Sequence, residues 1–476
     1  MFIKLYDNPD TMKYNLRTER KSHFHVIRLL LLSVCLLVFL GSCVREAPKS
    51  VSKPAGDDLP IESGASIDAL TIFFTGNELG ALKPCGCSGG QLGGIDRRSA
   101  VFDSVPDRNR LIVDTGSFVQ NEREQAMIKF NILVRAFKLL DYDLVNLTSK
   151  DIQTARNLGL LVNPTVEFVS SYTLEDDKVR TAFTKRYMLK DEPLDVSIVP
   201  FDPQMTNEQI SELLSSKAGV RSVNVLILNH YNGQILERIK RDLPSVDCLV
   251  CPAEGDEPAR MGDPGAGPLM FSIGRYGKYV CKLEITGSAQ ADGKKPVLSY
   301  SSVPVTEDLP HNISLVNLYK AYQKIVRQSN LLESHPRFTI DEGLKYVGSE
   351  SCQSCHEEIY DKWKQFGHAD AYSTLVEVGS EADPECIGCH VVGFDYETGY
   401  VSKEKTPNLI NVGCENCHGP GSEHKKIVGN VATGDPKLFC EDCHTPEHSS
   451  SFAAQKDEYF SKIKHWTELK SDRDVK

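Results

Sequence analysis

The sequence predicts an α/β domain followed by a smaller, mainly α-helical domain. Three observations support this prediction. The chain has 476 residues, which is too many for one ordinary domain and enough for two packed cores. Short apolar runs alternate with helical patterns between residues 67 and 305. Eight of the 15 cysteines form four closely spaced pairs between Cys352 and Cys443, so residues 343–476 form a part with different chemistry.

The chain begins with a leader rather than with a domain. An apolar run at residues 26–40 follows several basic residues and is short for a membrane span, which favours a signal peptide. The run ends in the letters LGSC, which resemble the lipobox of bacterial lipoproteins. The resemblance implies that residues 1–43 are a lipoprotein signal peptide and that lipid on Cys43 anchors the protein to the outer membrane, in the periplasm or at the cell surface. An uncleaved N-terminal anchor is the alternative. Residues 44–66, rich in Pro, Ser, Lys and Asp, predict a flexible tether.

The α/β prediction rests on alternating elements in residues 67–305. Apolar runs predict strands at 70–74, 111–113, 144–147, 196–199, 223–228 and 246–251. Helical spacing predicts helices at 125–140, 207–215 and 234–241. Continuous apolar strands of this kind are typical of a largely parallel or mixed sheet that is covered on both faces. Residues 306–342 are expected to connect the two domains through a helix near 313–334.

Several strings in the α/β region resemble the calcineurin-like metallophosphoesterases of the 5'-nucleotidase type. They are TIFFTGNELG at 71–80, GGIDRR at 93–98, VDTGSF at 113–118, YDLVNLTSKD at 142–151, LNHY at 228–231 and IGRYGKYV at 273–280, the last expected to be the closing strand. The resemblance implies a sandwich fold with a two-metal site built from Asp, His and Asn.

The metal ligands of that family are mostly replaced in this chain. The positions at which the family places ligands hold Asn77, Leu79, Ser117, Ser149, Lys150, Ala253 and Gly255, and only His230 remains. Leu79 and Ala253 cannot bind a cation, and Lys150 would repel one. We therefore expect a degenerate metallophosphoesterase-like domain whose phosphoesterase activity is lost.

Five cysteines of the α/β region lie outside the leader and outside the four closely spaced pairs: Cys85, Cys87, Cys248, Cys251 and Cys281. In the fold implied by the resemblance, the loops that carry Cys85, Cys87, Cys251 and His230 lie at one end of the sheet, where thiolates and an imidazole suit zinc or iron. The alternative, which we favour, is one or two disulfides, with Cys248 and Cys281 as buried strand residues.

The four cysteine pairs each belong to a C-x-x-C-H string. Two thiols three positions apart reach the two vinyl groups of one haem, and the next residue, histidine, then points at the iron. The strings join Cys352 and Cys355 to His356, Cys386 and Cys389 to His390, Cys414 and Cys417 to His418, and Cys440 and Cys443 to His444. They predict four covalently bound haem c groups with these histidines as proximal ligands. A zinc ribbon would leave the adjacent histidines unexplained.

The other side of each iron needs a second ligand. No methionine follows Met270, whereas residues 343–476 contain four histidines outside the four strings: His368, His424, His448 and His465. These numbers favour bis-His coordination, which is typical of electron transfer because both axial positions are filled.

Residues 343–465 also resemble the tetrahaem cytochrome c-554 family, most closely through CQSCHEEIYDKWKQFGHADAYSTL and CIGCHVVGFDYETGYVSKEKTPNLINVGCENCHGPGSEH. The resemblance implies that His424 is distal to the haem of His356, His368 to that of His418, and His465 to that of His444. In that family the haem that corresponds to His390 lacks a distal ligand, so either His448 fills the position or the iron stays open.

The net charge of −11 disfavours nucleic acid as a partner. We expect electron transfer by a secreted, lipid-anchored tetrahaem cytochrome whose partners are redox proteins: donor and acceptor cytochromes or quinol-linked complexes. The α/β domain would serve as a docking module or spacer. The alternative is a haem enzyme that reduces or oxidises a small nitrogen compound at an open iron. An active phosphoesterase is the third hypothesis and the least favoured.

Overall fold

The computed structural model describes residues 66–84, 90–174, 177–214, 220–263, 265, 267–287, 295–340, 343–427, 440–446, 448–449 and 451–465. The predictions for the leader, Cys43, the tether up to residue 65, and Cys85 and Cys87 lie outside these residues. The described residues belong to one compact unit, Leu59–Lys476. None of the helices in this described part is both long and apolar enough to span a membrane.

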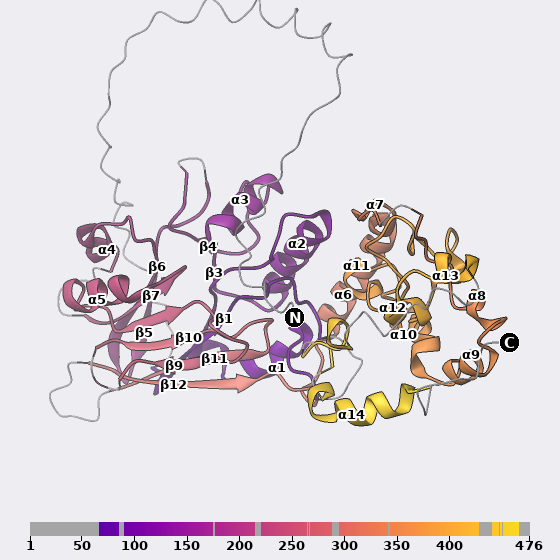
Figure 1. Cartoon of the computed structure of the whole chain (residues 1–476). Coiled ribbons are helices and arrows are strands. Elements are labelled where there is room, and N and C mark those ends of the chain that lie inside the picture. The colour runs from indigo at the N-terminus through magenta and orange to yellow at the C-terminus, as the bar shows by residue number, and fades with distance from the viewer. Residues whose placement is uncertain are drawn as a thin grey trace, which may run out of the picture. The chain divides into compact units, whose positions relative to one another are not determined.

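Two six-stranded sheets make up the α/β part, and Figure 1 shows their strands in indigo to pink. The first has the order β12-β11-β1-β2-β3-β4, with β1 to β4 parallel and with β11 and β12 added antiparallel. Its strands are β1 Ala69–Thr75, β2 Arg110–Asp114, β3 Leu144–Asn146, β4 Phe168–Val169, β11 Tyr279–Thr286 and β12 Val297–Pro304.

The second sheet has the order β5-β6-β7-β8-β10-β9. Its four central strands are parallel, and β5 and β9 pair antiparallel at the two edges. Its strands are β5 Phe183–Leu189, β6 Glu192–Phe201, β7 Arg221–Leu228, β8 Cys248–Cys251, β9 Ala259–Met261 and β10 Leu269–Ser272.

Helices cover the outer faces of both sheets. The α-helices of this part are α1 Arg98–Phe102, α2 Glu124–Leu139, α3 Ser149–Asn157, α4 Asn207–Leu213, α5 Gly233–Asp242 and α6 Ile313–Gln328. Helices α2 and α6 share one apolar core with the first sheet, and α4 and α5 share another with the second. A third core lies between the sheets, where the rings of Phe74 and Phe271 meet at 5.7 Å. The layers are therefore helix, sheet, sheet, helix.

This layering explains why the strands are continuous apolar runs. In β1, Ile72 and Phe74 face the core between the sheets, whereas Phe73 faces the core under α2 and α6. Successive side chains of a strand point to opposite faces, so a strand covered on both sides must be apolar throughout. The six predicted strands and three predicted helices of this part are confirmed, with small shifts at their ends.

One prediction is wrong. The sequence predicts a closing strand at 273–280, but most of this string forms the turn between β10 and β11. Tyr276 and Gly277 have φ values of 60° and 61°, which an extended strand does not allow. A Cβ on Gly274 would lie 2.4 Å from the carbonyl oxygen of Asp256, so this turn also needs a glycine where two backbone segments approach.

The described residues after α6 contain short helices and no strand beyond isolated bridges. The helices are α7 Leu331–Ser334, α8 Glu350–Gln353, α9 Glu357–Trp363, α10 Ala371–Val378, α11 Pro384–Ile387, α12 Cys414–His418, α13 Ser422–Lys426 and α14 Phe452–Ile463. Figure 1 shows them in orange and yellow. Their apolar core is small and is built around Tyr372, Ile387 and Phe394. This part has the mainly α-helical class that we predicted.

Candidate functional site

Each C-x-x-C-H string lies at a single helical turn. Three of the turns belong to α8, α11 and α12, and the fourth is a 3-10 helix at Cys440–Asp442. In the first and fourth strings the histidine N–H donates to the carbonyl of the first cysteine, at 2.9 Å for His356 and 2.8 Å for His444. Such a turn places both thiols on one side and returns the histidine towards them. The local fold therefore has the geometry that attachment to one haem requires.

Three of the four motif histidines lie opposite a histidine from outside the motifs. The ring centroids are 6.0 Å apart for His356 and His424, 6.1 Å for His418 and His465, and 6.2 Å for His368 and His444. A ligating imidazole nitrogen lies about 2 Å from its metal. Two imidazoles on opposite sides of one metal therefore have centroids about 6 Å apart. The three pairs fit a six-coordinate haem iron.

Two of these pairs differ from those that the resemblance implied. We expected His368 opposite His418 and His465 opposite His444, but the structure pairs them the other way. The physical reason is that the second and fourth motifs meet at Cys389 and Cys443, so that both His390 and His444 lie near His368. The carbonyl of His368 accepts the N–H of Val412 at 3.0 Å, and Lys362 Nζ donates to the carbonyl of Lys464 at 2.7 Å. These contacts join His368 to the segment before the third motif and Lys362 to the residue before His465.

His390 has a defined tautomer. Its Nδ1 lies 2.6 Å from the carbonyl oxygen of Ala371, at the first residue of α10. A carbonyl only accepts, so Nδ1 carries the proton and the lone pair is on Nε2. An imidazole held in this way by a backbone carbonyl has the usual arrangement of a metal-ligating histidine. The geometry fits a proximal ligand.

His448 lies in none of the three ring pairs. Its Nδ1 is 2.7 Å from the hydroxyl of Thr445, and its carbonyl accepts the Gln91 side-chain amide at 3.2 Å. Its contacts therefore tie it to its own turn and to the α/β part.

Two of the candidate distal ligands, His368 and His465, have environments that favour the neutral, metal-binding imidazole. Burial lowers the pKa of His368, and nearby His444 and His390 lower it further. Burial also lowers the pKa of His465. Both shifts favour the neutral imidazole, which is the form that binds a metal.

The cysteines of different motifs lie close together. Side-chain hydrogen bonds join Cys352 to Cys414 and Cys389 to Cys443. The pKa of Cys417 is raised mainly by burial, and the nearby Cys440 thiol raises it further. None of the eight motif cysteines forms a disulfide. The four attachment sites thus follow one another in space in the order of His356, His418, His444 and His390.

The loops that correspond to the predicted metal site of the α/β part are occupied by structural contacts. The Asp151 carboxylate accepts the N–H of Ser117 at 2.7 Å and that of Phe118 at 3.1 Å. Asp114 accepts the Thr75 hydroxyl at 2.6 Å. Lys150 and His230 are exposed to solvent. The carboxylates that remain in these loops hold backbone and hydroxyl groups.

A buried ion pair lies beside these loops. Arg98 and Glu78, which are 1% and 0% exposed, pair at 2.8 Å, and Arg98 also donates to the Tyr142 hydroxyl at 3.3 Å. Burial, followed by the charge of Glu78, raises the pKa of Asp114 well above its usual range.

The described cysteines of the α/β part are buried thiols in strands. Cys248 and Cys251 lie in β8, and Cys281 lies in β11. All three are free, so no disulfide joins Cys248 to Cys251. Burial and the charge of Glu254 raise the pKa of Cys251 to about 12. The other two cysteines of the soft-metal hypothesis, Cys85 and Cys87, lie outside the described residues. Within the described residues, no three His, Cys, Asp or Glu side chains converge as a metal site would need.

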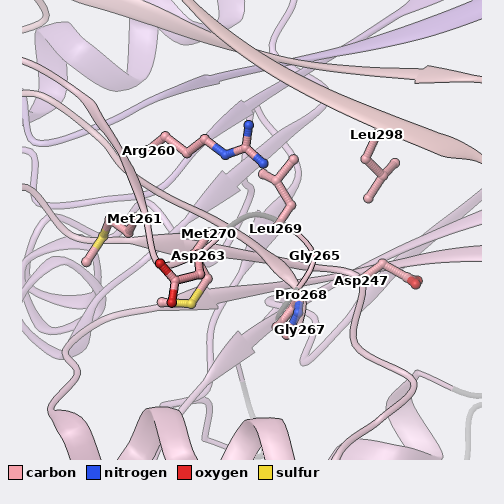
Figure 2. A pocket seen from close by; sticks show the side chains of 10 residues that line it. All are labelled: Asp247, Arg260, Met261, Asp263, Gly265, Gly267, Pro268, Leu269, Met270 and Leu298. Atoms are coloured by element: carbon pink, nitrogen blue, oxygen red, sulfur yellow. The ribbon is translucent and has the colours of Figure 1, made fainter.

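A surface cavity of about 230 Å³ lies at β9 and β10 of the second sheet (Figure 2). It is lined by Asp247, Arg260, Met261, Asp263, Gly265, Gly267, Pro268, Leu269, Met270 and Leu298. None of these residues was predicted from the sequence to form a site.

The C-terminal part matches known cytochromes. Residues 351–419 match the family model described as cytochrome c554 and c-prime. Cytochrome c-554 of Nitrosomonas europaea is 37% identical over 100 residues, which cover 17% of this chain and 43% of that protein. The C-type polyheme cytochrome OmcB of Geobacter sulfurreducens is 30% identical over 94 residues, covering 18% of this chain and 12% of that protein. The chain thus spans less than half the length of either relative.

The α/β part is similar to solved phosphoesterases. The calcineurin-like phosphoesterase YfkN from Bacillus subtilis has a TM-score of 0.43 at 12% identity, covering 54% of this chain and 97% of that chain. The 5'-nucleotidase precursor from Thermus thermophilus has a TM-score of 0.42 at 17% identity, covering 65% of this chain and 68% of that chain.

Proposed function

We propose that this chain, whose segment 351–419 is of the cytochrome c554 type, is an electron-transfer protein with four covalently attached haem c groups. The observation that carries the proposal is the 6.0–6.2 Å spacing of the three histidine pairs. Haem c supplies a one-electron iron couple when bound. The cysteine pairs and motif histidines of the chain would hold it, and at three of the four sites a second histidine lies opposite the motif histidine.

The roles follow from the positions of the side chains. Each cysteine pair attaches one group, and His356, His390, His418 and His444 are the proximal ligands. On the opposite side, His424 serves the site of His356. His465 serves the site of His418, and His368 serves that of His444. Sites with histidine on both faces leave no position for substrate, which supports a carrier rather than a catalyst.

The order of the attachment sites supports a continuous row of redox centres. Cys352 is hydrogen-bonded to Cys414, Cys417 lies near Cys440, and Cys443 is hydrogen-bonded to Cys389. Neighbouring attachment points keep successive centres close together. The row would end at the site of His356 on one side and at that of His390 on the other.

A haem enzyme that acts on a small nitrogen compound is the second candidate. The site of His390 is the one that favours it. The other three motif histidines each have a second histidine opposite them. The fourth spare histidine, His448, is hydrogen-bonded to Thr445. We propose that the α/β part has no phosphoesterase activity, since its remaining loop carboxylates hold backbone and hydroxyl groups.

The leader supports a proposal for the location of the protein. The lipobox-like string at Cys43 supports a protein that is anchored to the outer membrane by lipid, in the periplasm or at the cell surface. Its partners would be redox proteins that donate and accept electrons. We also propose domains at 67–305 and 343–476, joined by a connecting segment at 306–342.

Intact-mass measurement and visible spectroscopy of the purified full chain test the function. We expect the mass of four added haems and reversible reduction of all of them. A chain with fewer haems, or one that dithionite does not reduce and air does not reoxidise, would contradict the proposal.

A further inference from the structure

Three buried polar side chains join the α/β part to the C-terminal part. Gln125 Nε2, on α2, donates to Asp383 Oδ1 at 2.6 Å, and the Tyr322 hydroxyl, on α6, donates to Asp383 Oδ2 at 2.8 Å. Gln125 also lies 2.9 Å from the Tyr322 hydroxyl. These side chains are 8%, 7% and 1% exposed for Gln125, Asp383 and Tyr322 respectively. The three side chains form a closed triangle of hydrogen bonds, in which Gln125 and Asp383 are 258 residues apart in the sequence.

Asp383 is also the first residue of the second attachment turn. It is the N-cap of α11, and its Oδ1 accepts the N–H of Glu385 at 2.9 Å. Its carbonyl accepts the N–H of Cys386 at 3.0 Å. The same residue therefore bonds to α2 and α6 on one side and fixes the turn that carries Cys386 on the other.

A second line of contacts reaches His390. Gln323 of α6 donates to the carbonyl of Val378 at 2.7 Å and lies 3.1 Å from the Ser380 hydroxyl, at the end of α10. The beginning of α10 supplies the Ala371 carbonyl that holds His390 Nδ1 at 2.6 Å. Both the cysteine turn and the histidine of this site are thus supported by elements that α6 binds.

Charged side chains also lie at this interface. Lys129 of α2, 8% exposed, pairs with Glu385 at 2.5 Å, and Glu385 precedes Cys386 directly. One ammonium and two carboxylates therefore lie beside this attachment turn. Reduction adds one negative charge at the site, so a neighbouring carboxylate opposes it and a neighbouring ammonium favours it. Asp383 and Lys129 are shielded from solvent, so their charges act more strongly than that of Glu385, whose side chain is 60% exposed.

We propose that α2 and α6 form one wall of the haem site of Cys386, Cys389 and His390, and that Asp383 and Lys129 set its reduction potential. The α/β part then tunes one end of the row of redox centres instead of serving as a spacer. This inference rests on the proposed function, because it requires a redox group at that site.

The test is a potentiometric titration of the full holoprotein, with each centre followed by its EPR and visible signals. Asp383→Asn and Glu385→Gln each remove a negative charge and should raise one midpoint potential. Lys129→Met removes a positive charge and should lower the same potential. The matched control is Arg186→Met in the edge strand β5. Arg186 forms an ion pair with Asp195 at 2.6 Å, and its side chain is 10% exposed, as is that of Lys129. This control variant should move none of the potentials.

Opposite shifts confined to one centre would support the inference, since a merely structural role of these residues predicts no dependence on the sign of the charge. Shifts of one sign in all variants, equal movement of every centre, or no movement would overturn it. If Asp383→Asn fails to fold, Glu385→Gln keeps the sign test, because the Glu385 side chain is 60% exposed. Mass mapping of the peptide that contains Cys386 and Cys389 distinguishes a failure of the proposed function from a failure of this inference. A wild-type chain without haem there contradicts the proposed function, whereas a loaded site with unmoved potentials contradicts this inference alone.

Discussion

Single histidines decide which centres have two axial ligands. His424 faces His356 with ring planes 20° apart and is held on α13, so the pair depends on one side chain from each of two short segments. A haem keeps its covalent attachment through cysteine when its distal histidine is lost. The consequence of removing that histidine should therefore be confined to coordination.

His424→Ala should convert one low-spin centre into a high-spin one without loss of haem. The open iron should then bind carbon monoxide after reduction, which EPR and visible spectroscopy detect. His311→Ala is the control, because His311 bonds to Asp96 at 2.8 Å and belongs to no histidine pair among the described residues. An EPR spectrum of His424→Ala identical to that of the wild type would rule out His424 as a ligand.

Asp114 gives the α/β part a pH-dependent stability. Burial, and then Glu78, raise its pKa in the folded state above the value in the unfolded chain. A carboxyl with a raised folded pKa contributes stability that is present below the unfolded pKa and is lost as the pH rises towards the folded pKa. Asp114→Asn imitates the protonated carboxyl and lacks this dependence.

Compared with Asp114→Asn, the wild-type α/β part should therefore lose stability from about pH 4 upward. The difference in free energy of unfolding should change by up to about 1.4 kcal/mol per pH unit. Denaturant unfolding at pH 5 and pH 8, followed by circular dichroism, measures it. Equal pH dependence of the two proteins would show that Asp114 does not carry the effect.

At the scale of elements, the sequence predicted those parts of the fold that have a periodic signal. The strands covered on both faces, such as β1 and β7, were found because they are apolar throughout. The edge strands β5 and β12 were missed because their exposed sides are polar and break the apolar run. The sequence also did not show which distal histidine lies opposite which motif histidine. The pairing of His368 with His444 and of His465 with His418 joins segments that are far apart in the chain.

The interface on α11 was missed for a different reason. Gln125, Tyr322 and Asp383 are ordinary residues in sequence, and their triangle exists only once α2 and α6 pack together. One local signal was available. Asp383 followed by Pro384 is a helix start, with a capping side chain and proline in the first turn. It could have shown that a helical turn begins just before Cys386.

The helices α8 to α13 contain 4 to 8 residues each. Helices of this length are not stable alone in water. Their small apolar core suggests that the bound groups provide much of the packing. Alanine at both Cys414 and Cys417 should therefore destabilise the whole C-terminal part, because α12 also holds residues 347 and 348 through the buried Glu415.

Limited proteolysis with haem staining of the fragments measures this effect. Cys248→Ala is the control, because it removes a buried thiol from β8, outside the motifs, at a cost of about 1 kcal/mol. Accumulation of a protease-resistant form with three haems would contradict the expected cooperation between the sites.

At the scale of the whole molecule, the chain joins an α/β sandwich to a part that carries four C-x-x-C-H strings, and the contacts at Asp383 and Lys129 connect the two. The position of this assembly in the cell depends on the leader. If Cys43 carries lipid, the wild-type protein should fractionate with membranes and incorporate labelled palmitate. Cys43→Ser should lose the label. Equal labelling of both proteins would contradict the anchor, whereas the redox function would be unaffected.

The central claim is that histidine pairs from distant parts of the chain ligate most of the bound irons. Low-temperature EPR of the oxidised full chain, quantified against its haem content, tests it most directly. We predict at least three low-spin bis-histidine centres per chain, from the pairs His356 and His424, His418 and His465, and His368 and His444. Mainly high-spin iron, or fewer than three such centres in a fully loaded protein, would contradict the account.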